Sequence, residues 1–490
     1  MNRAMQVSAR VRRVNDAELC PSGDYVLYWM TSARRPAHNF ALDYAIARAR
    51  ELEKPVLVLE ALTSGYRWAS DRLHRFVLEG MADNRAAFAN SALRYYPYVE
   101  PSAKAGRGLV EALAKRAALV VADDFPCFFL PRLLASVGCR LPVRCEAVDG
   151  NGIVPLSAVP REFARAFDFR RFLAKQFHEH AQVRPKQRPL QNLRLPKLSG
   201  LPREVLSRWP MPSEALLSGD AHALARLPID HGVRPAAVRG GYRAAREVLA
   251  RFREQRLRAY VDDRNHPDLQ ATSELSAYLH FGHISAHEIL AAVLDDDELS
   301  FDELEPAPNA QKGPFFQLRP SPGAYLDQLV TWRELGYNFC VRRPKDYCDY
   351  ESLPAWAQRS LAEHENDARE VRYAHEQLES GSTGDPLWNA AQHQLVESGQ
   401  MQNYMRMLWG KRVIGWTSSP QVAYETLVEL NNKYALDGRN PNSYSGIGWC
   451  FGRYDRPWGP ERSVYGLVRF MSSDSARRKL RLKEYLKRWG

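Results

Sequence analysis

We expect the fold to be organised around residues 385–416, DPLWNAAQHQLVESGQMQNYMRMLWGKRVIGW. This stretch is rich in helix-forming residues and brings Trp388, Trp409 and Trp416 together in an apolar setting. Trp409 and Trp416 are seven positions apart, so on one helix they share a face. Polar side chains that need partners when buried also occur here, namely Asn389, Gln392 and Arg406. Taken alone, aromatic residues at helical spacing indicate a packed core more often than a cofactor site, so the flanking sequence has to decide.

The length and composition are those of a globular protein with more than one domain. At 490 residues the chain exceeds one ordinary hydrophobic core, so we expect two or three domains. Hydrophobic residues make up 45% and charged residues 26%, which is typical of soluble proteins. The formal net charge of +11 suits a polyanionic partner, although it does not distinguish nucleic acid from general surface basicity.

Cysteine usage and the first residues predict an intracellular protein. The seven cysteines include no CxxC pair, which indicates reduced thiols and argues against structural zinc, so no metal site is expected. The start, MNRAMQVSARVRRVND, lacks the apolar run of a signal peptide. No segment approaches the ~20 apolar residues that cross a bilayer. We expect a cytoplasmic protein without a membrane partner, associated with the nucleoid if the source is bacterial.

The amino-terminal half alternates between strand-like and helix-like segments. Apolar runs typical of buried strands occupy residues 25–30, 55–60, 93–99, 117–123 and 142–147. Helical patterns separate them, at 38–52, 70–92, 108–116 and 131–137. The alternation predicts a doubly wound parallel sheet of five strands, a Rossmann-like fold. No GxGxxG follows the first strand and no GxxxxGKS or GxxxxGKT occurs, which argues against a dinucleotide-dependent oxidoreductase or a P-loop nucleotidase.

The rest of the chain predicts a linker and an all-helical domain. Residues 183–203 are dense in Pro, Arg and Lys, as in an extended linker. Beyond residue 236 apolar residues recur at helical spacing, most clearly at 241–259, 273–295, 323–342, 354–379, 386–415 and 419–433. The predicted organisation is an N-terminal extension (1–24), an α/β domain (25–150), a linker (151–235) and a helical domain (236–490).

Two polar constellations lie in the first part of the helical half. The run Thr272-Ser-Glu-Leu-Ser276 precedes a helical pattern, where hydroxyls and free N–H groups suit either phosphate binding or simple helix capping. Gln328 and Trp332 are four residues apart and therefore share a helical face.

Two further constellations lie near the carboxyl end. Asn431 and Asp437 occur where a helix ends and turns, and both side chains can bond the polar edge of a heterocycle. Trp449 lies in the glycine-rich run 446–452 and could serve as a stacking platform.

Six blocks in this order resemble the class II cyclobutane pyrimidine dimer photolyases. The blocks are TSELSAYLHFGHIS, LVTWRELGYNFC, DPLWNAAQ, YMRMLWGKRVIGW, LNNKYALDGRNPNSYSGIGWCFG and RPWGPERSVYGLVRFM. The resemblance covers nearly the whole chain, including the order of α/β domain, linker and helical domain. It implies light-driven repair of cyclobutane dimers in UV-damaged DNA by a monomer that carries non-covalent FAD, active as FADH⁻. Class II enzymes often hold a second, light-harvesting chromophore in the α/β domain, commonly a deazaflavin.

The resemblance also assigns roles to residues of the flavin site. Those implied to bind the cofactor are Tyr260, Thr272, Ser273, Leu275, Ser276, Trp388, Asn389, Gln392, Arg406, Asn431 and Asp437. Asn431 would face the flavin N5, and Asp437, paired with Arg406, would meet the polar edge of the ring. An electron relay for photoreduction would begin at Trp409 and continue through Trp388, with Trp416 and Tyr373 as outward candidates.

Lesion contact is implied for a separate set of residues. The extruded dimer would stack between Trp332 and Trp449 beside Met407, and Arg264 would contact the lesion or its phosphate. Family members commonly place a carboxylate where Gln328 stands here. An amide donates hydrogen bonds but cannot supply a proton, so repair efficiency or substrate preference is where this chain departs from the pattern.

Three alternatives remain open at this point. A cryptochrome, a blue-light sensor, shares the fold and flavin, but Trp332 and Trp449 are retained and no long signalling tail follows the family core, which favours repair. An iron–sulfur member needs four ligands, and the cysteines that could converge are three, Cys340, Cys348 and Cys450. A non-catalytic, basic nucleic-acid-binding protein with an aromatic core would contain no flavin.

Overall fold

The computed structural model describes residues 9–296, 298–301, 303–310 and 312–490. The chain forms two compact units, and neither is continuous in sequence. The α/β unit comprises the chain up to Pro160 together with Gln176–Ala250 and Leu275–Glu303. The helical unit comprises Arg161–Lys175, Arg251–Glu274 and Leu304–Gly490. Each unit is therefore built from separate segments of the chain, whereas the predicted domains were continuous ranges.

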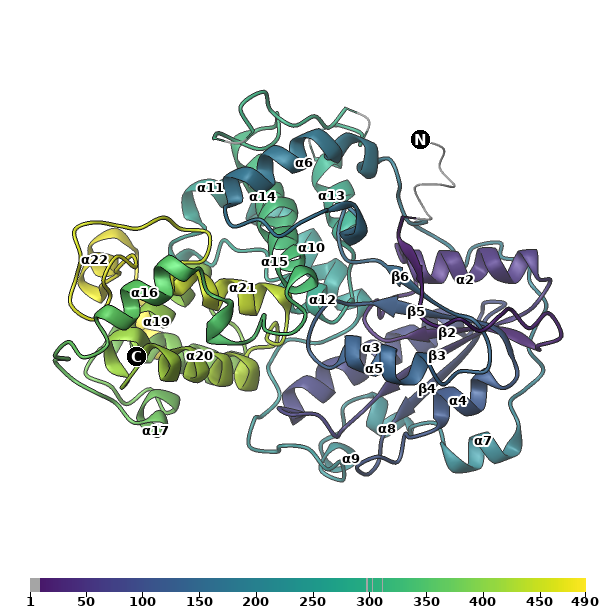
Figure 1. Ribbon diagram of the computed structural model, residues 1–490. Helices are drawn as coiled ribbons and strands as arrows, with labels where there is room; N and C mark the ends of the chain where they lie inside the picture. The colour runs from purple at the N-terminus through teal and green to yellow at the C-terminus, as the bar shows by residue number, and fades with distance from the viewer. Residues whose placement is uncertain (1–8, 297, 302, 311) are drawn as a thin grey trace. The chain divides into compact units, whose positions relative to one another are not determined.

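The α/β unit is built on a six-stranded sheet in the order β1-β6-β5-β2-β3-β4 (Figure 1). Its strands are β1 (Val11–Arg13), β2 (Tyr25–Met30), β3 (Val56–Leu62), β4 (Arg94–Val99), β5 (Ala117–Asp124) and β6 (Cys145–Asp149). Strands β2 to β6 pair in parallel, so the predicted doubly wound parallel sheet is confirmed. Strands β2, β3 and β4 are neighbours in that order, and β5 and β6 then continue the sheet on the other side of β2.

The two faces of the sheet follow the period of two of extended chains. Along β2, Val26, Tyr28 and Met30 join the core that includes helix α2 (Phe40–Glu51). Tyr25, Leu27 and Trp29 join the opposite core, which includes helices α4 (Leu109–Ala114) and α5 (Leu130–Gly138). All six β2 residues are buried, as expected for a central parallel strand covered by helices on both faces.

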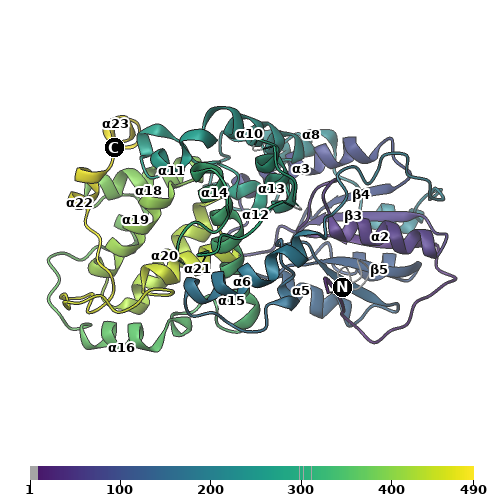
Figure 2. The same cartoon turned by 90° about the horizontal axis from the view of Figure 1, so that it is seen from above.

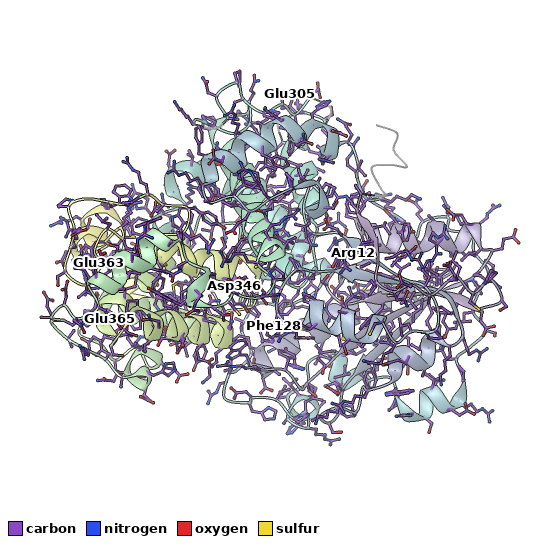
Figure 3. The ribbon with its side chains drawn as sticks, in the orientation of Figure 1. Arg12, Phe128, Glu305, Asp346, Glu363 and Glu365 are labelled. Carbon is purple, nitrogen blue, oxygen red and sulfur yellow. The ribbon has the colours of Figure 1, made fainter. Side chains whose placement is uncertain are left out.

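Strand β1 was not predicted. It lies within the range assigned to an N-terminal extension, of which residues 1–8 fall outside the described part of the chain. Val11–Arg13 pairs antiparallel with β6 and forms an edge of the sheet. A strand of three residues with two arginines has no alternation to detect, and charged residues are common on edge strands. Arg12, labelled in Figure 3, bonds the Asp124 carboxylate from Nε at 2.6 Å.

The predicted linker contains regular structure. The helices of the α/β unit, with those that cross a unit boundary, are α2 (Phe40–Glu51), α3 (Asp71–Phe88), α4 (Leu109–Ala114), α5 (Leu130–Gly138), α6 (Ala166–Ala181), α7 (Arg203–Arg208), α8 (Glu214–Leu217), α9 (Ala221–Leu224), α10 (Tyr242–Gln255), α12 (Ser276–His280) and α13 (Ala286–Asp295). Helices α6 to α9 lie in the range predicted as linker. The short length of α7, α8 and α9 and the proline-rich connections conceal a helical period there, whereas α6, with 16 residues, was missed despite its length.

The helical unit consists of short and medium helices (Figure 2). Its core is rich in aromatic residues. Its helices are α11 (Tyr260–Asp263), α14 (Pro320–Asp327), α15 (Arg333–Arg342), α16 (Ala355–Glu363), α17 (His375–Glu379), α18 (Pro386–Ser398), α19 (Asn403–Trp416), α20 (Pro420–Tyr434), α21 (Pro441–Cys450), α22 (Ser473–Lys479) and α23 (Lys483–Trp489). The predicted segment 386–415 is two helices, because Gly399 ends α18 in the left-handed conformation with φ 71°. No helix in the described part of the chain is long and apolar enough to span a membrane.

Candidate functional site

Helices α18 and α19 hold the tryptophans on which the sequence analysis centred. Asp385 starts α18, because its carboxylate accepts hydrogen bonds from the N–H groups of Leu387 and Trp388, both at 3.2 Å. Gln402 starts α19 by accepting from the Met405 N–H at 3.0 Å. Gly410 lets α19 approach α21, since a Cβ there would lie 2.5 Å from the sulfur of Cys450.

The tryptophans and one tyrosine form a continuous line of ring contacts in the helical unit. Trp409 and Trp388 are stacked, with ring centroids 6.4 Å apart and planes inclined by 8°. Trp388 meets Trp416 edge-on at 5.4 Å, and Trp416 meets Tyr373 edge-on at 5.3 Å. The structure therefore brings together all four residues predicted for the relay, in the order 409, 388, 416 and 373.

The outer end of this line carries charge and is more exposed than the inner end. Tyr373 is half-buried, and its hydroxyl accepts the Gly384 N–H at 2.7 Å. The guanidinium of Arg412 lies 4.5 Å from the Trp416 ring and 3.4 Å from the Asp385 carboxylate. A cation beside an indole opposes its oxidation, so Trp416 and Tyr373 differ in environment from the uncharged inner pair.

The two amides of α18 are bonded to the protein itself. Gln392 is fully buried, accepts the Trp409 indole N–H at 2.9 Å and donates to the Glu379 carbonyl at 2.9 Å. Asn389 is tied to Thr383, accepting from its hydroxyl at 2.6 Å and donating to its carbonyl at 2.8 Å. Gln392 thus fixes the Trp409 indole, and Asn389 fixes the segment before α18, through contacts that the sequence did not reveal.

The polar group predicted to meet a heterocycle is assembled around the turn after α20. Arg406, three residues before Trp409 on α19, pairs with Asp437 at 2.8 Å, and both side chains are mostly buried. Asn431 is 5% exposed and donates to the Asn432 side chain at 3.3 Å. Among the described residues, no donor bonds the Asn431 Oδ1.

Arg439 was not singled out by the sequence analysis, although it holds this turn together. It is buried with φ 58°, a conformation unusual for a residue with a side chain. Its guanidinium donates to the carbonyls of Asn432, in the last turn of α20, and of Ala435 and Leu436, which follow the helix. A buried arginine after a helix is visible in sequence only as one more basic residue.

Trp332 and Trp449 form a second aromatic pair, and both are half-buried. Their rings stack directly, with centroids 4.8 Å apart and planes inclined by 17°. This spacing leaves no room for another ring between them in the present arrangement. Stacking of a dimer between the two rings stays a prediction. Gln328 and Trp332 lie in one π-helical turn, Gln328–Trp332, between α14 and α15. Such turns are rare and frequent at functional sites.

Two polar side chains, Lys411 and Asp455, were also not predicted from the sequence. Lys411 is buried on α19 and donates from Nζ to the Cys450 carbonyl at 2.9 Å, at the carboxyl end of α21. Burial raises the pKa of the Asp455 carboxyl, an effect that the charge of Lys411 opposes. Burial lowers the pKa of Lys411. Met407, half-buried on α19, packs against the core of the unit.

Tyr260 and Arg264 lie together in the helical unit with the hydroxyl run that follows them. Tyr260 is buried, and the Arg264 guanidinium is 5.5 Å from its ring. Ser273 lies near the buried Tyr325, whose ring is 5.3 Å from that of Tyr260. The Thr272 carbonyl accepts from Arg256 at 3.2 Å.

The helix expected to follow this run begins later than its hydroxyls suggest. Helix α12 starts at Ser276 and has five residues, and its N-cap position is Leu275, which makes no side-chain cap. Capping by Thr272 or Ser273 is therefore not observed. Leu275 and Ser276 belong to the α/β unit, whereas Thr272 and Ser273 belong to the helical unit.

The residues near α19 fit a flavin. The Arg406–Asp437 pair offers a carboxylate acceptor and guanidinium donors in a mostly buried place, which matches the N–H and carbonyl groups at the polar edge of an isoalloxazine. The Asn431 Oδ1 is available to accept an N–H. The neighbouring Trp409 and Trp388 are 3% and 0% exposed and provide a dry, aromatic surround.

No group of three or more His, Cys, Asp or Glu side chains that could hold a metal ion occurs in residues 9–296, 298–301, 303–310 and 312–490. Cys340 and Cys450 are buried and Cys348 is partly buried, all as free thiols. The described residues therefore contain no ligand set for an iron–sulfur cluster.

Solved structures define the class of protein to which this architecture belongs. A bacterial class III photolyase from Agrobacterium tumefaciens matches with a TM-score of 0.65 at 18% identity, over 95% of this chain and 86% of its own. A cryptochrome from Synechocystis sp. PCC6803 matches with a TM-score of 0.64 at 14% identity, over 95% of this chain and 88% of its own. At these identities the comparison concerns the fold, which is that of photolyases and cryptochromes.

Sequence relatives decide between the two. A deoxyribodipyrimidine photo-lyase from Methanothermobacter thermautotrophicus is 34% identical over 98% of this chain and 97% of the relative. Those of Oryza sativa and Arabidopsis thaliana are 32% and 31% identical over 98% and 94% of this chain, and 90% and 88% of their own. No protein-family model matches the chain. The chain belongs to the deoxyribodipyrimidine photo-lyase family of light-dependent DNA-repair enzymes, and the cryptochrome-like alternative is not favoured.

Proposed function

We propose that this photo-lyase splits cyclobutane pyrimidine dimers in UV-damaged DNA, with FAD bound in the helical unit between the Arg406–Asp437 pair and the tryptophans of α18 and α19. The observation that carries the proposal is the continuous line from Trp409 to Tyr373, which starts one turn from Arg406 on the same helix. A line of touching rings from a buried polar pair to a half-buried tyrosine suits electron supply to a buried redox group.

The residues of the chain divide the work around that cofactor. When bound in its reduced form, FAD supplies the light-excited electron that opens the cyclobutane ring. Asp437 accepts from the polar edge of the ring, Arg406 neutralises the charge there, and Asn431 accepts at N5. Trp409 and Trp388 exclude water from the site and deliver electrons when the cofactor arrives oxidised.

The dimer is recognised on the half-buried tryptophan pair. A cyclobutane dimer cannot reach a buried cofactor from inside the duplex and has to be extruded. In this proposal it stacks on the joined surface of Trp332 and Trp449 beside Met407, while Gln328 donates hydrogen bonds to its carbonyls and Arg264 meets its phosphate. The rings either serve as one platform or separate to admit the dimer.

Binding of the flanking DNA is supported by the basic carboxyl-terminal segment. Seven side chains of helices α22 and α23 and the turn between them are exposed and cationic, namely Arg477, Arg478, Lys479, Arg481, Lys483, Lys487 and Arg488. The segment docks beside the Arg264 loop, because the Arg481 N–H bonds the His266 ring at 3.2 Å and the Asp268 N–H bonds the Arg481 carbonyl at 3.3 Å. Phosphate contacts from these cations would make binding salt-dependent.

An antenna chromophore of the deazaflavin type is proposed for the α/β unit. Tyr66, Trp68, Phe128 and Phe129 form an aromatic cluster beyond the ends of β3 and β5, with Tyr66 stacked on Phe129 at 5.5 Å. Trp68 and Phe128 have φ values of 69° and 62°, and such strain is common at ligand sites. Phe128 is labelled in Figure 3. Ligands of doubly wound sheets bind at this end of the strands.

Spectroscopy followed by illumination tests the proposal. The purified protein should absorb as a flavoprotein, and blue light should restore dimer-containing oligonucleotide to intact thymines. Asn431→Ala protein should remain folded but lose repair. A colourless preparation that binds undamaged DNA equally well would overturn the proposal. Size-exclusion chromatography with light scattering and cell fractionation check the further expectations of a monomer in the cytoplasm.

A further inference from the structure

The side chain of Gln392 spans two partners inside the helical unit. It is 0% exposed on α18, one turn after Trp388. Its Oε1 accepts the indole N–H of Trp409 at 2.9 Å, and its Nε2 donates to the Glu379 carbonyl at 2.9 Å. An indole N–H can only donate and a backbone carbonyl can only accept, so the orientation of the amide is fixed by its partners.

The neighbouring indole meets the same kind of acceptor. Trp388 donates from Nε1 to the backbone carbonyl of Trp409 at 2.9 Å. Both inner indoles of the line therefore bond amide oxygens, which accept hydrogen bonds but are far too weakly basic to take a proton. Of the carboxylates close to this pair, that of Asp385 bonds the backbone N–H of Trp388 at 3.2 Å, and that of Glu379 bonds Lys433 and Tyr434, both at 2.7 Å.

These acceptors matter because an indole that loses an electron becomes a strong acid at its N–H. With a basic acceptor the oxidised ring loses its proton and becomes a neutral radical, which is a poor oxidant and traps the charge. With an amide acceptor the N–H bond stays intact. The positive charge then remains mobile and can pass to a stacked neighbour.

We propose that Gln392 is a positioning residue of the electron relay, which keeps Trp409 protonated while it is oxidised. The inference rests on the proposed function, in which a photoexcited oxidised flavin takes one electron from Trp409. An electron from Trp388 refills Trp409, and no proton moves at either ring. Proton release is postponed until the charge reaches the outer end, where Tyr373 is half-buried rather than enclosed.

The test compares three variants of the flavin-loaded protein. Gln392→Met removes the acceptor, Gln392→Glu replaces it with a base, and Gln394→Glu makes the same change two residues away. Gln394 accepts from the Tyr485 hydroxyl at 2.9 Å and is a matched control on α18. The first readout needs no light: hydrogen exchange of the Trp409 indole N–H, assigned by its loss in Trp409→Phe protein.

We expect that exchange to be about tenfold faster in Gln392→Met, as for loss of one buried hydrogen bond, and unchanged in Gln394→Glu. Transient absorption after a flash should reveal a neutral indole radical formed at the inner pair in Gln392→Glu and a cation radical there in the parent. Equal exchange in Gln392→Met, or an inner neutral radical in the parent, would overturn the inference. Absence of any photoreduction in the parent would instead count against the proposed function.

Discussion

The two tryptophan pairs of the helical unit differ in burial, although both consist of stacked rings. Trp388 and Trp409 are 0% and 3% exposed, and their indole N–H groups are bonded to amide oxygens. Trp332 and Trp449 are half-buried, and their rings lie closer together, at 4.8 Å against 6.4 Å. A relay needs rings that are fixed and dry, whereas a binding surface needs a face that a ligand can reach.

The turn between α20 and α21 carries Asp437, which pairs with Arg406 near Trp409, and it leads into the helix that carries Trp449. Disrupting this turn should therefore give the largest loss of stability. Arg439→Ala would leave the buried carbonyls of Asn432 and Leu436 without a donor and relax the turn that carries Asp437. We expect a loss of about 3 kcal/mol in the free energy of unfolding, measured by urea titration. Arg359→Ala, at an exposed position on α16, should change it by less than about 0.5 kcal/mol. Equal values for the two variants would remove the assigned role of Arg439.

The inner pair is tested by Trp409→Phe. The flavin loses its adjacent donor, so photoreduction of the oxidised cofactor should slow about hundredfold, equivalent to about 2.7 kcal/mol of activation free energy. Repair by chemically reduced protein should be unchanged, which separates the relay from lesion binding. Trp356→Phe, at the edge of the same core but outside the line of rings, is the control. If the chemically reduced Trp409→Phe protein repaired dimers more slowly, the inner pair would also take part in repair, and the assigned difference between the two pairs would be wrong.

The outer pair is tested by Trp449→Ala. Loss of one stacking surface should weaken binding of dimer-containing DNA by about 1–3 kcal/mol, measured by fluorescence anisotropy in the dark. Photoreduction should remain at the parental rate. Because Trp332 and Trp449 stack on each other, the Trp332→Ala change should not add to it in the double variant. Additive losses would indicate two independent contacts rather than one joint platform.

The fold was largely predictable because its signals are local. The five parallel strands are short and mostly apolar, and each predicted range overlaps its strand to within three residues at either end, whereas the three-residue β1 has no pattern. The break at Gly399 was also beyond reach, since the residues on either side keep a helical spacing. The exchange of segments between the two units depends on contacts far apart in the chain, which no window of sequence contains.

For the candidate site, the sequence indicated which residues lie together but not which hydrogen-bond partners they have. Motif resemblance selected the four relay residues, and the structure places them in contact. It did not reveal that Gln392 bonds Trp409, that Lys411 reaches the Cys450 carbonyl or that Arg439 closes a turn. The first two contacts join residues from different helices, so those partners become apparent only once the helices are packed. Arg439 bonds carbonyls three to seven residues earlier, in a turn whose conformation the sequence does not show.

Gln328 provides the smallest and most specific test of the platform. An amide donates hydrogen bonds at any pH, so this residue should add no pH dependence to repair in the parent. In Gln328→Glu the side chain donates only while protonated and becomes acceptor-only as pH rises through its pKa. Repair by the variant should therefore match the parent at low pH and fall about two- to tenfold at high pH, the cost of one hydrogen bond. Photoreduction should not change, because Gln328 belongs to the turn that carries Trp332 and not to α18 or α19. A flat pH profile equal to that of the parent would show that Gln328 does not touch the dimer, and the platform would then consist of the two rings alone.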